Sequence, residues 1–65
     1  MSLYRDTYLQ QDFSMALHHY KYDTNKAIQY VLRENGKAWN MAFKEMIEEL
    51  YPQYVPNLDK ILLLL

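Results

Sequence analysis

The chain has 65 residues, a formal net charge of −1, no cysteine and 51% hydrophobic residues. Without cysteine there is no disulfide, thiolate metal site or cysteine nucleophile, and the hydrophobic content is too high for a disordered chain. The slightly negative charge argues against general electrostatic attraction to nucleic acid or to anionic membranes. The length allows one domain, residues 1–65, of marginal stability, because so short a chain buries only about 60% of the surface exposed on unfolding.

The first predicted helix covers residues 7–20. Its apolar residues recur at i, i+4, i+7, i+8 and i+11, which is the spacing of one helical face. They are Leu9, Phe13, Ala16, Leu17 and Tyr20. Thr7 and Gln10 fit a capping box, in which each side chain accepts from the backbone N–H of the other residue.

A second helix is predicted over residues 24–35. Asp23 or Thr24 can cap its start, and Gly36 can end it by adopting a left-handed conformation. Its apolar positions are Ala27, Ile28, Val31 and Leu32. Because only about three residues separate the two helical patterns, we expect the helices to fold back on each other as a hairpin.

The strongest apolar periodicity lies in a third predicted helix, residues 37–51. The stripe is formed by Trp39, Ala42, Phe43, Met46, Ile47 and Leu50. The other face carries Glu45, Glu48 and Glu49, with Lys44 placed to pair with Glu48 at i, i+4. Either a basic partner or simple solvation can account for this acidic face.

The segment 52–56 is predicted to be an extended connector, since each proline biases the preceding residue away from helix. Asn57 then caps a short final helix, residues 57–65. The sequence therefore predicts an all-α fold, a small helical bundle of three helices plus a short C-terminal helix. The expected core is Leu9, Phe13, Leu17, Ala27, Ile28, Val31, Trp39, Phe43, Met46, Ile47 and Leu50.

No catalytic, cofactor-binding or metal-binding residues are predicted, and we do not expect an enzyme. His18 and His19 are adjacent, so their side chains point about 100° apart on a helix and cannot chelate one ion. Asp6 and Asp12 lie on different sides of a helix, and no glycine-rich loop is present to bind a phosphate.

The apolar run Ile61–Leu65 is the main indication of a partner. Five consecutive large side chains cannot all face one core, because they point around the helix. A partner protein covers them, a second copy does, or the chain belongs to a longer protein. We expect a non-catalytic protein–protein interaction module, self-associating as a homo-oligomer through residues 37–51 or the tail. The predicted partner-binding residues are Tyr30, Leu32, Leu58, Ile61, Leu62 and Leu65.

Two further expectations follow from the apolar runs and the first residues. The longest apolar run is far shorter than the ~20 residues needed to cross a bilayer, so no membrane partner is expected. The start of the chain, MSLYRD, lacks the apolar segment of a signal peptide, so a cytoplasmic location is expected.

A small helix-turn-helix DNA-binding regulator is the alternative function. The second predicted helix carries Asn25, Lys26, Gln29 and Arg33, residue types that DNA-reading helices use. Against nucleic acid, the net charge leaves few cations to contact phosphates.

Residues 16–32 resemble the last two helices of ubiquitin-associated (UBA) and CUE-type domains. The family pattern there is an Ala-Leu pair, a polar turn, an Ala-aliphatic pair and two further aliphatic residues. Here these are Ala16-Leu17, a turn around residues 21–24, Ala27-Ile28 and Val31-Leu32. The resemblance implies a UBA-like helical hairpin at the centre of a binding module, with Leu32 as the one matched contact position. The family's Met-Gly-Phe loop would fall on residues 6–8, where only Tyr8 is similar.

Overall fold

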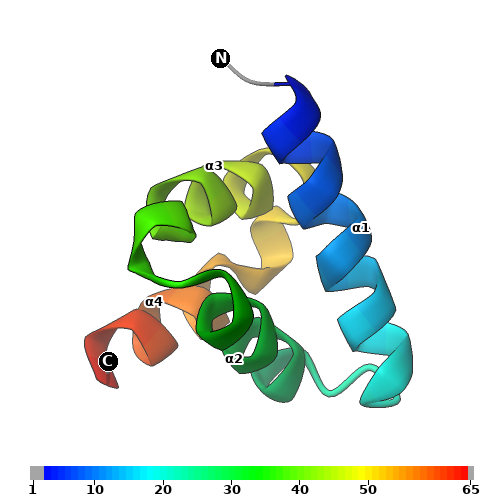
Figure 1. Cartoon of the computed structure of the whole chain (residues 1–65). Coiled ribbons are helices and arrows are strands. Elements are labelled where there is room, and N and C mark those ends of the chain that lie inside the picture. Colours follow the sequence, from blue (N-terminus) through cyan, green and yellow to red (C-terminus); the bar gives the residue numbers. More distant parts are fainter. Residues whose placement is uncertain (1–2, 65) are drawn as a thin grey trace.

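Helices account for nearly all of residues 3–64, the part of the chain that the computed structural model describes, with side chains from residue 7 onward. The α-helices are α1 (Leu3–His19), α2 (Thr24–Asn35), α3 (Asn40–Leu50) and α4 (Val55–Leu64). Two short 3-10 helices, η1 (Lys37–Trp39) and η2 (Pro52–Tyr54), precede α3 and α4. Because no strand occurs among these residues, the all-α prediction is confirmed. Figure 1 shows α1 along one side of the molecule, with α2 and α3 both packed against it.

The start of α1 differs from its prediction. The helix begins at Leu3 instead of residue 7, so Thr7 lies inside it and does not cap it. Residues 3–6 contain neither Gly nor Pro, and a threonine in a helix interior costs well under about 1 kcal/mol. The capping-box interpretation of Thr7 and Gln10 is therefore wrong.

The turn between α1 and α2 is closed by backbone hydrogen bonds. The Tyr22 N–H donates to the Leu17 carbonyl at 2.6 Å, and the Lys21 N–H donates to the His18 carbonyl at 3.2 Å. This pair of bonds is the Schellman motif, which places a left-handed residue just after the helix. That residue is Lys21, with φ 54°, followed by Tyr22 with φ 66°. The chain thereby reverses, and α1 and α2 pack against each other as expected.

Both predicted ends of α2 are confirmed. Asp23 is the N-cap, and its carboxylate accepts a hydrogen bond from the Lys26 N–H at 3.2 Å. Gly36 ends the helix with φ 76°, and its N–H donates to the Leu32 carbonyl. At this positive φ a residue with a Cβ would be strained.

The connector between α3 and α4 is helical where an extended segment was expected. Pro52 opens η2, and Pro56 lies in the first turn of α4. A proline is tolerated at these positions, because the first N–H groups of a helix have no acceptor within it. Asn57 consequently lies within α4 and does not cap it. Its amide donates to the side-chain oxygen of Asn25 on α2 at 3.0 Å.

The core draws on all four α-helices. Most of the predicted core is buried, and Phe13 of α1 is fully enclosed. Its ring makes edge-to-face contacts with Phe43, Tyr51 and Tyr54, at centroid distances of 5.6, 5.3 and 6.0 Å. Such pairs contribute about 0.5–1.5 kcal/mol each beyond the burial of area. These contacts hold α3 and η2 against α1.

Two predicted core residues lie outside the fully buried set. Leu50, in the last turn of α3, is 48% exposed. Trp39 is half-buried, and its ring packs edge-to-face on Tyr8 with centroids 5.5 Å apart. Leu58 and Ile61 of α4, which the sequence assigned to a partner surface, are buried in this core instead. Lys44 also departs from its prediction, since it pairs with Asp59 of α4 at 3.8 Å and not with Glu48.

Leu50 was expected in the core and is half-exposed, whereas Leu58 was expected at a partner surface and is buried. This difference generates a stability prediction. Leu58→Ala should lower the free energy of unfolding by about 2–5 kcal/mol, because it leaves a cavity in a closed core. Leu50→Ala removes the same atoms from a half-exposed site and should cost less than half as much. Urea denaturation of the two variants measures the difference, and equal costs would contradict the packing of α4.

The turn after α1 generates a second prediction. Lys21→Gly should raise the free energy of unfolding by roughly 0.5–1 kcal/mol, because glycine adopts the left-handed conformation without a Cβ penalty. Lys21→Ala, which keeps the Cβ, is the control and should give no gain. Thermal or urea unfolding distinguishes them, and a glycine variant less stable than the alanine variant would contradict the turn geometry.

Candidate interaction surface

The C-terminal helix α4 has an inner and an outer face. Leu58 and Ile61 point into the core, and Leu62 is half-buried beside them. Leu63 and Leu64 are exposed by 86% and 84% of their surface. Two adjacent leucines are thus almost entirely in solvent within a chain whose core is otherwise closed.

A groove runs between α2 and α4, next to these leucines. Its volume is about 610 Å³, and its apolar lining is formed by Leu32, Ile61, Leu62 and Leu64. Arg33 of α2 and Lys37 of η1 line it as exposed cations, and no carboxylate belongs to its lining among the described residues. Figure 1 shows the two helices that flank it, α2 in green and α4 in orange to red. The bend at Gly36, also in the lining, carries the chain from α2 to Lys37.

The structure gathers only part of the predicted partner-binding set. Leu32, Ile61 and Leu62 lie together in the groove, the first two with only a small part of their surface exposed. Leu58 is fully buried, so its side chain cannot contact a partner. Tyr30 does not belong to the groove lining, and Leu65 lies outside the described residues.

Of the α4 residues expected to bind a partner, Leu58 and Ile61 are buried, while Leu62 is half-buried in the groove lining. Leu58, Ile61 and Leu62 follow i, i+3, i+4 spacing, the same signal that located the core face of the earlier helices. That spacing indicates the side that packs inward, and the two leucines that follow it, Leu63 and Leu64, are exposed.

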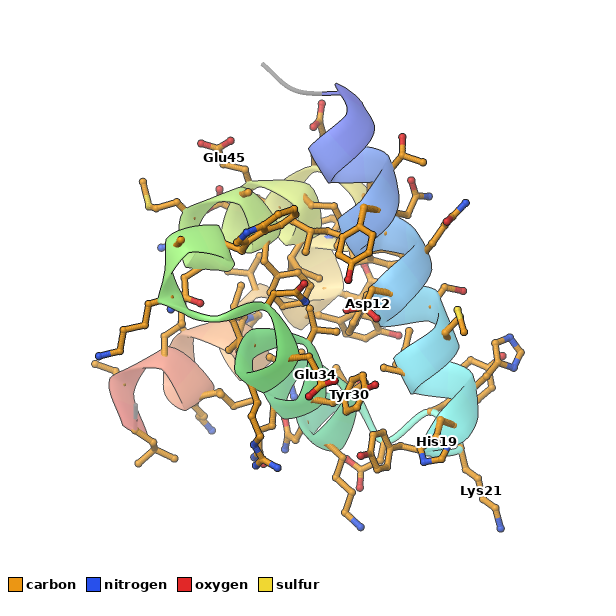
Figure 2. All side chains as sticks on the ribbon, viewed as in Figure 1. Asp12, His19, Lys21, Tyr30, Glu34 and Glu45 are labelled. Atoms are coloured by element: carbon orange, nitrogen blue, oxygen red, sulfur yellow. The ribbon has the colours of Figure 1, made fainter. Side chains whose placement is uncertain are left out.

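Tyr30 lies on a different part of α2, near α1. Figure 2 shows its ring beside Glu34 and close to Asp12. The Glu34 carboxylate, with smaller contributions from desolvation and from Asp12, raises the pKa of the Tyr30 phenol above its usual value. The ring also meets Tyr20 edge-to-face at 6.0 Å. This contact places Tyr30 against the turn after α1.

The histidines lie at the far end of α1. Both are exposed, and the Tyr22 hydroxyl lies 3.1 Å from the His18 Nε2. Figure 2 shows His19 and Lys21 pointing outward from this end of the molecule. Within the described part of the chain no group of three His, Asp or Glu side chains gathers as metal ligands would. The candidate interaction surface is instead the apolar groove between α2 and α4, with its two cations.

A second exposed surface lies on the outer side of α3. Met41 is 72% exposed, and Glu45 and Glu48 follow it at i+4 and i+7 on the same side of the helix. Figure 2 shows Glu45 pointing away from α2 and α4. Among the residues whose side chains are described, Lys44–Asp59 is the ion pair that forms, and the glutamates of α3 take no part in it.

Comparison with known proteins gives no match to a family model, to a curated protein or to a solved structure. No helix in residues 3–64 combines the length and the apolar character that crossing a membrane requires. The interpretation of the surface therefore rests on its geometry and charge.

Proposed function

We propose that this chain is a non-catalytic protein–protein interaction module that associates with a second copy of itself. The surface it uses is the exposed end of α4 together with the adjacent groove. The observation that carries the proposal is the exposure of Leu63 and Leu64, 86% and 84%, beside an open apolar groove. A small domain gains stability when association covers such a surface.

The free energies of burial and association indicate that the interface includes more than these two leucines. Burying one leucine side chain contributes about 1.5–3 kcal/mol. Association costs roughly 4–15 kcal/mol in lost translational and rotational freedom. Leu63 and Leu64 alone are insufficient to offset that cost comfortably. The contact therefore includes the groove, whose exposed apolar lining extends through Leu62 and Leu64.

The resemblance of residues 16–32 to UBA and CUE-type domains supports a binding role, and we propose that the α1–α2 hairpin is UBA-like. The one matched contact position, Leu32, lines the groove. Residues 6–8, where that family has its Met-Gly-Phe loop, lie within α1. Because ubiquitin recognition in the family uses this loop, we do not extend the proposal to ubiquitin.

Sedimentation of the intact chain tests the proposal. At concentrations from about ten to several hundred micromolar the protein should sediment as a dimer or larger species. The double variant Leu63→Gln/Leu64→Gln should sediment as a monomer, because the apolar contact is lost. Met15→Gln alters another exposed apolar residue, on α1 and 72% exposed, and should leave association unchanged. A monomer for the unaltered chain across this range would overturn the proposal.

A DNA-binding regulator is the second candidate, and one observation favours it. Lys26, Gln29 and Arg33 all lie exposed on the outer side of α2, where a reading helix needs such groups. Titration with random duplex DNA at two salt concentrations tests it. We expect no binding even at low salt, because non-specific affinity depends on neutralising phosphates. Binding that weakens steeply with salt would favour the DNA-binding function over self-association.

A further inference from the structure

The groove between α2 and α4 is both apolar and positively charged. Leu32, Leu62 and Leu64 provide apolar surface, while Arg33 and Lys37 place two exposed cations in its lining. Because no described carboxylate belongs to that lining, these charges are not neutralised within the groove. The segment that fits there has apolar side chains flanked by carboxylates.

The outer side of α3 has this composition. Met41, Glu45 and Glu48 occupy i, i+4 and i+7, so one flexible apolar side chain and two carboxylates lie in a row along the helix. Methionine adapts its shape to an apolar groove and is common on binding surfaces. The glutamates form no ion pair within the described side chains. Glu48 also lies near the C-terminus of α3, where the negative end of the helix dipole repels a carboxylate. A cation from outside the chain would relieve that repulsion.

We propose that the α3 face Met41–Glu45–Glu48 of one copy docks into the α2–α4 groove of another. The inference rests on the self-association proposed above and names the two surfaces that meet. Met41 enters the apolar groove, and the two glutamates lie against Arg33 and Lys37. This is the helix-in-groove mode of recognition, with anchors at i, i+4 and i+7.

A second copy fits the groove better than a nucleic acid or a membrane does. Either of those would supply negative charge, but the groove between the cations is apolar and would leave Leu62 and Leu64 facing a polar backbone or head group. The chain itself supplies both complementary surfaces. Figure 2 shows Glu45 pointing away from α2 and α4, so this carboxylate does not face the groove of its own copy.

Charge reversal in two separate chains tests the pairing. One chain carries Arg33→Glu/Lys37→Glu, so its groove and its α3 face are both acidic. The other carries Glu45→Lys/Glu48→Lys, so both of its surfaces are basic. Each variant alone should self-associate roughly tenfold or more weakly than the unaltered chain, because like charges then face each other. An equimolar mixture should recover association, since every groove meets a face of opposite charge.

The outcomes separate this inference from the proposed function. If the unaltered chain is monomeric, the proposed function fails and this inference fails with it. If the unaltered chain associates but either reversed chain associates equally well alone, the pairing is wrong and the function stands. If both reversed chains are monomeric and their mixture also stays monomeric, the pairing is again wrong.

A milder set of variants guards against loss of folding. Arg33→Gln/Lys37→Gln and Glu45→Gln/Glu48→Gln remove charge without reversing it, and all four residues are at the surface or partly exposed. Each pair of changes, made alone, should raise the dissociation constant of the dimer. When the glutamate changes are added to the chain that already carries Arg33→Gln/Lys37→Gln, they should have no further effect. Lys26→Gln, an exposed cation of α2 outside the groove lining, is the matched control and should not alter association. Additive effects of the two neutral pairs would overturn the pairing.

Discussion

The fold depends on the enclosure of Phe13. This ring stands on α1 and is covered by Phe43 from α3, by Tyr51 after it and by Tyr54 from η2. Truncating a buried phenylalanine costs about 3–5 kcal/mol, a large fraction of the stability of a domain this small. The two sections of chain that follow α2 must therefore return to α1. With α3 and η2 there, α4 packs against both α2 and α3.

The α1–α2 hairpin could be predicted because its determinants are local. The apolar spacing around Phe13, Ala16 and Leu17 identifies one packing face from nearby residues alone. Asp23 and Gly36 act through their own side chain and backbone, so their roles at the two ends of α2 are visible in the sequence. The Schellman turn was not foreseen, because the left-handed position holds Lys21 where glycine is usual.

The other errors arise where distant contacts decide. Leu50 follows the apolar period of α3, but it lies in the last turn, at the end of the face that packs on α1 and α4, and so remains half-exposed. Leu58 and Ile61 have the helical spacing of an inward face, but Ile61 opens an apolar run, Ile61–Leu65, that has no polar residue to mark the outward side. Pro52 and Pro56 suit an extended chain and a first helical turn equally well. The candidate groove was missed for the same reason, since its lining comes from α2, η1, the first residue of α3 and α4.

Net charge conceals how the charges are arranged. A value of −1 gives no indication that two cations border an apolar groove while carboxylates gather along α3. Folding separates these groups because the apolar faces of α2 and α3 turn inward, which leaves their charged faces pointing to different sides of the molecule. Under the self-association proposed above, a surface divided in this way would attract a copy of itself in certain orientations and repel it in others. Leu63 and Leu64, left in solvent, add apolar surface next to the groove that carries the two cations, so the apolar and the acidic surfaces of the chain are separate.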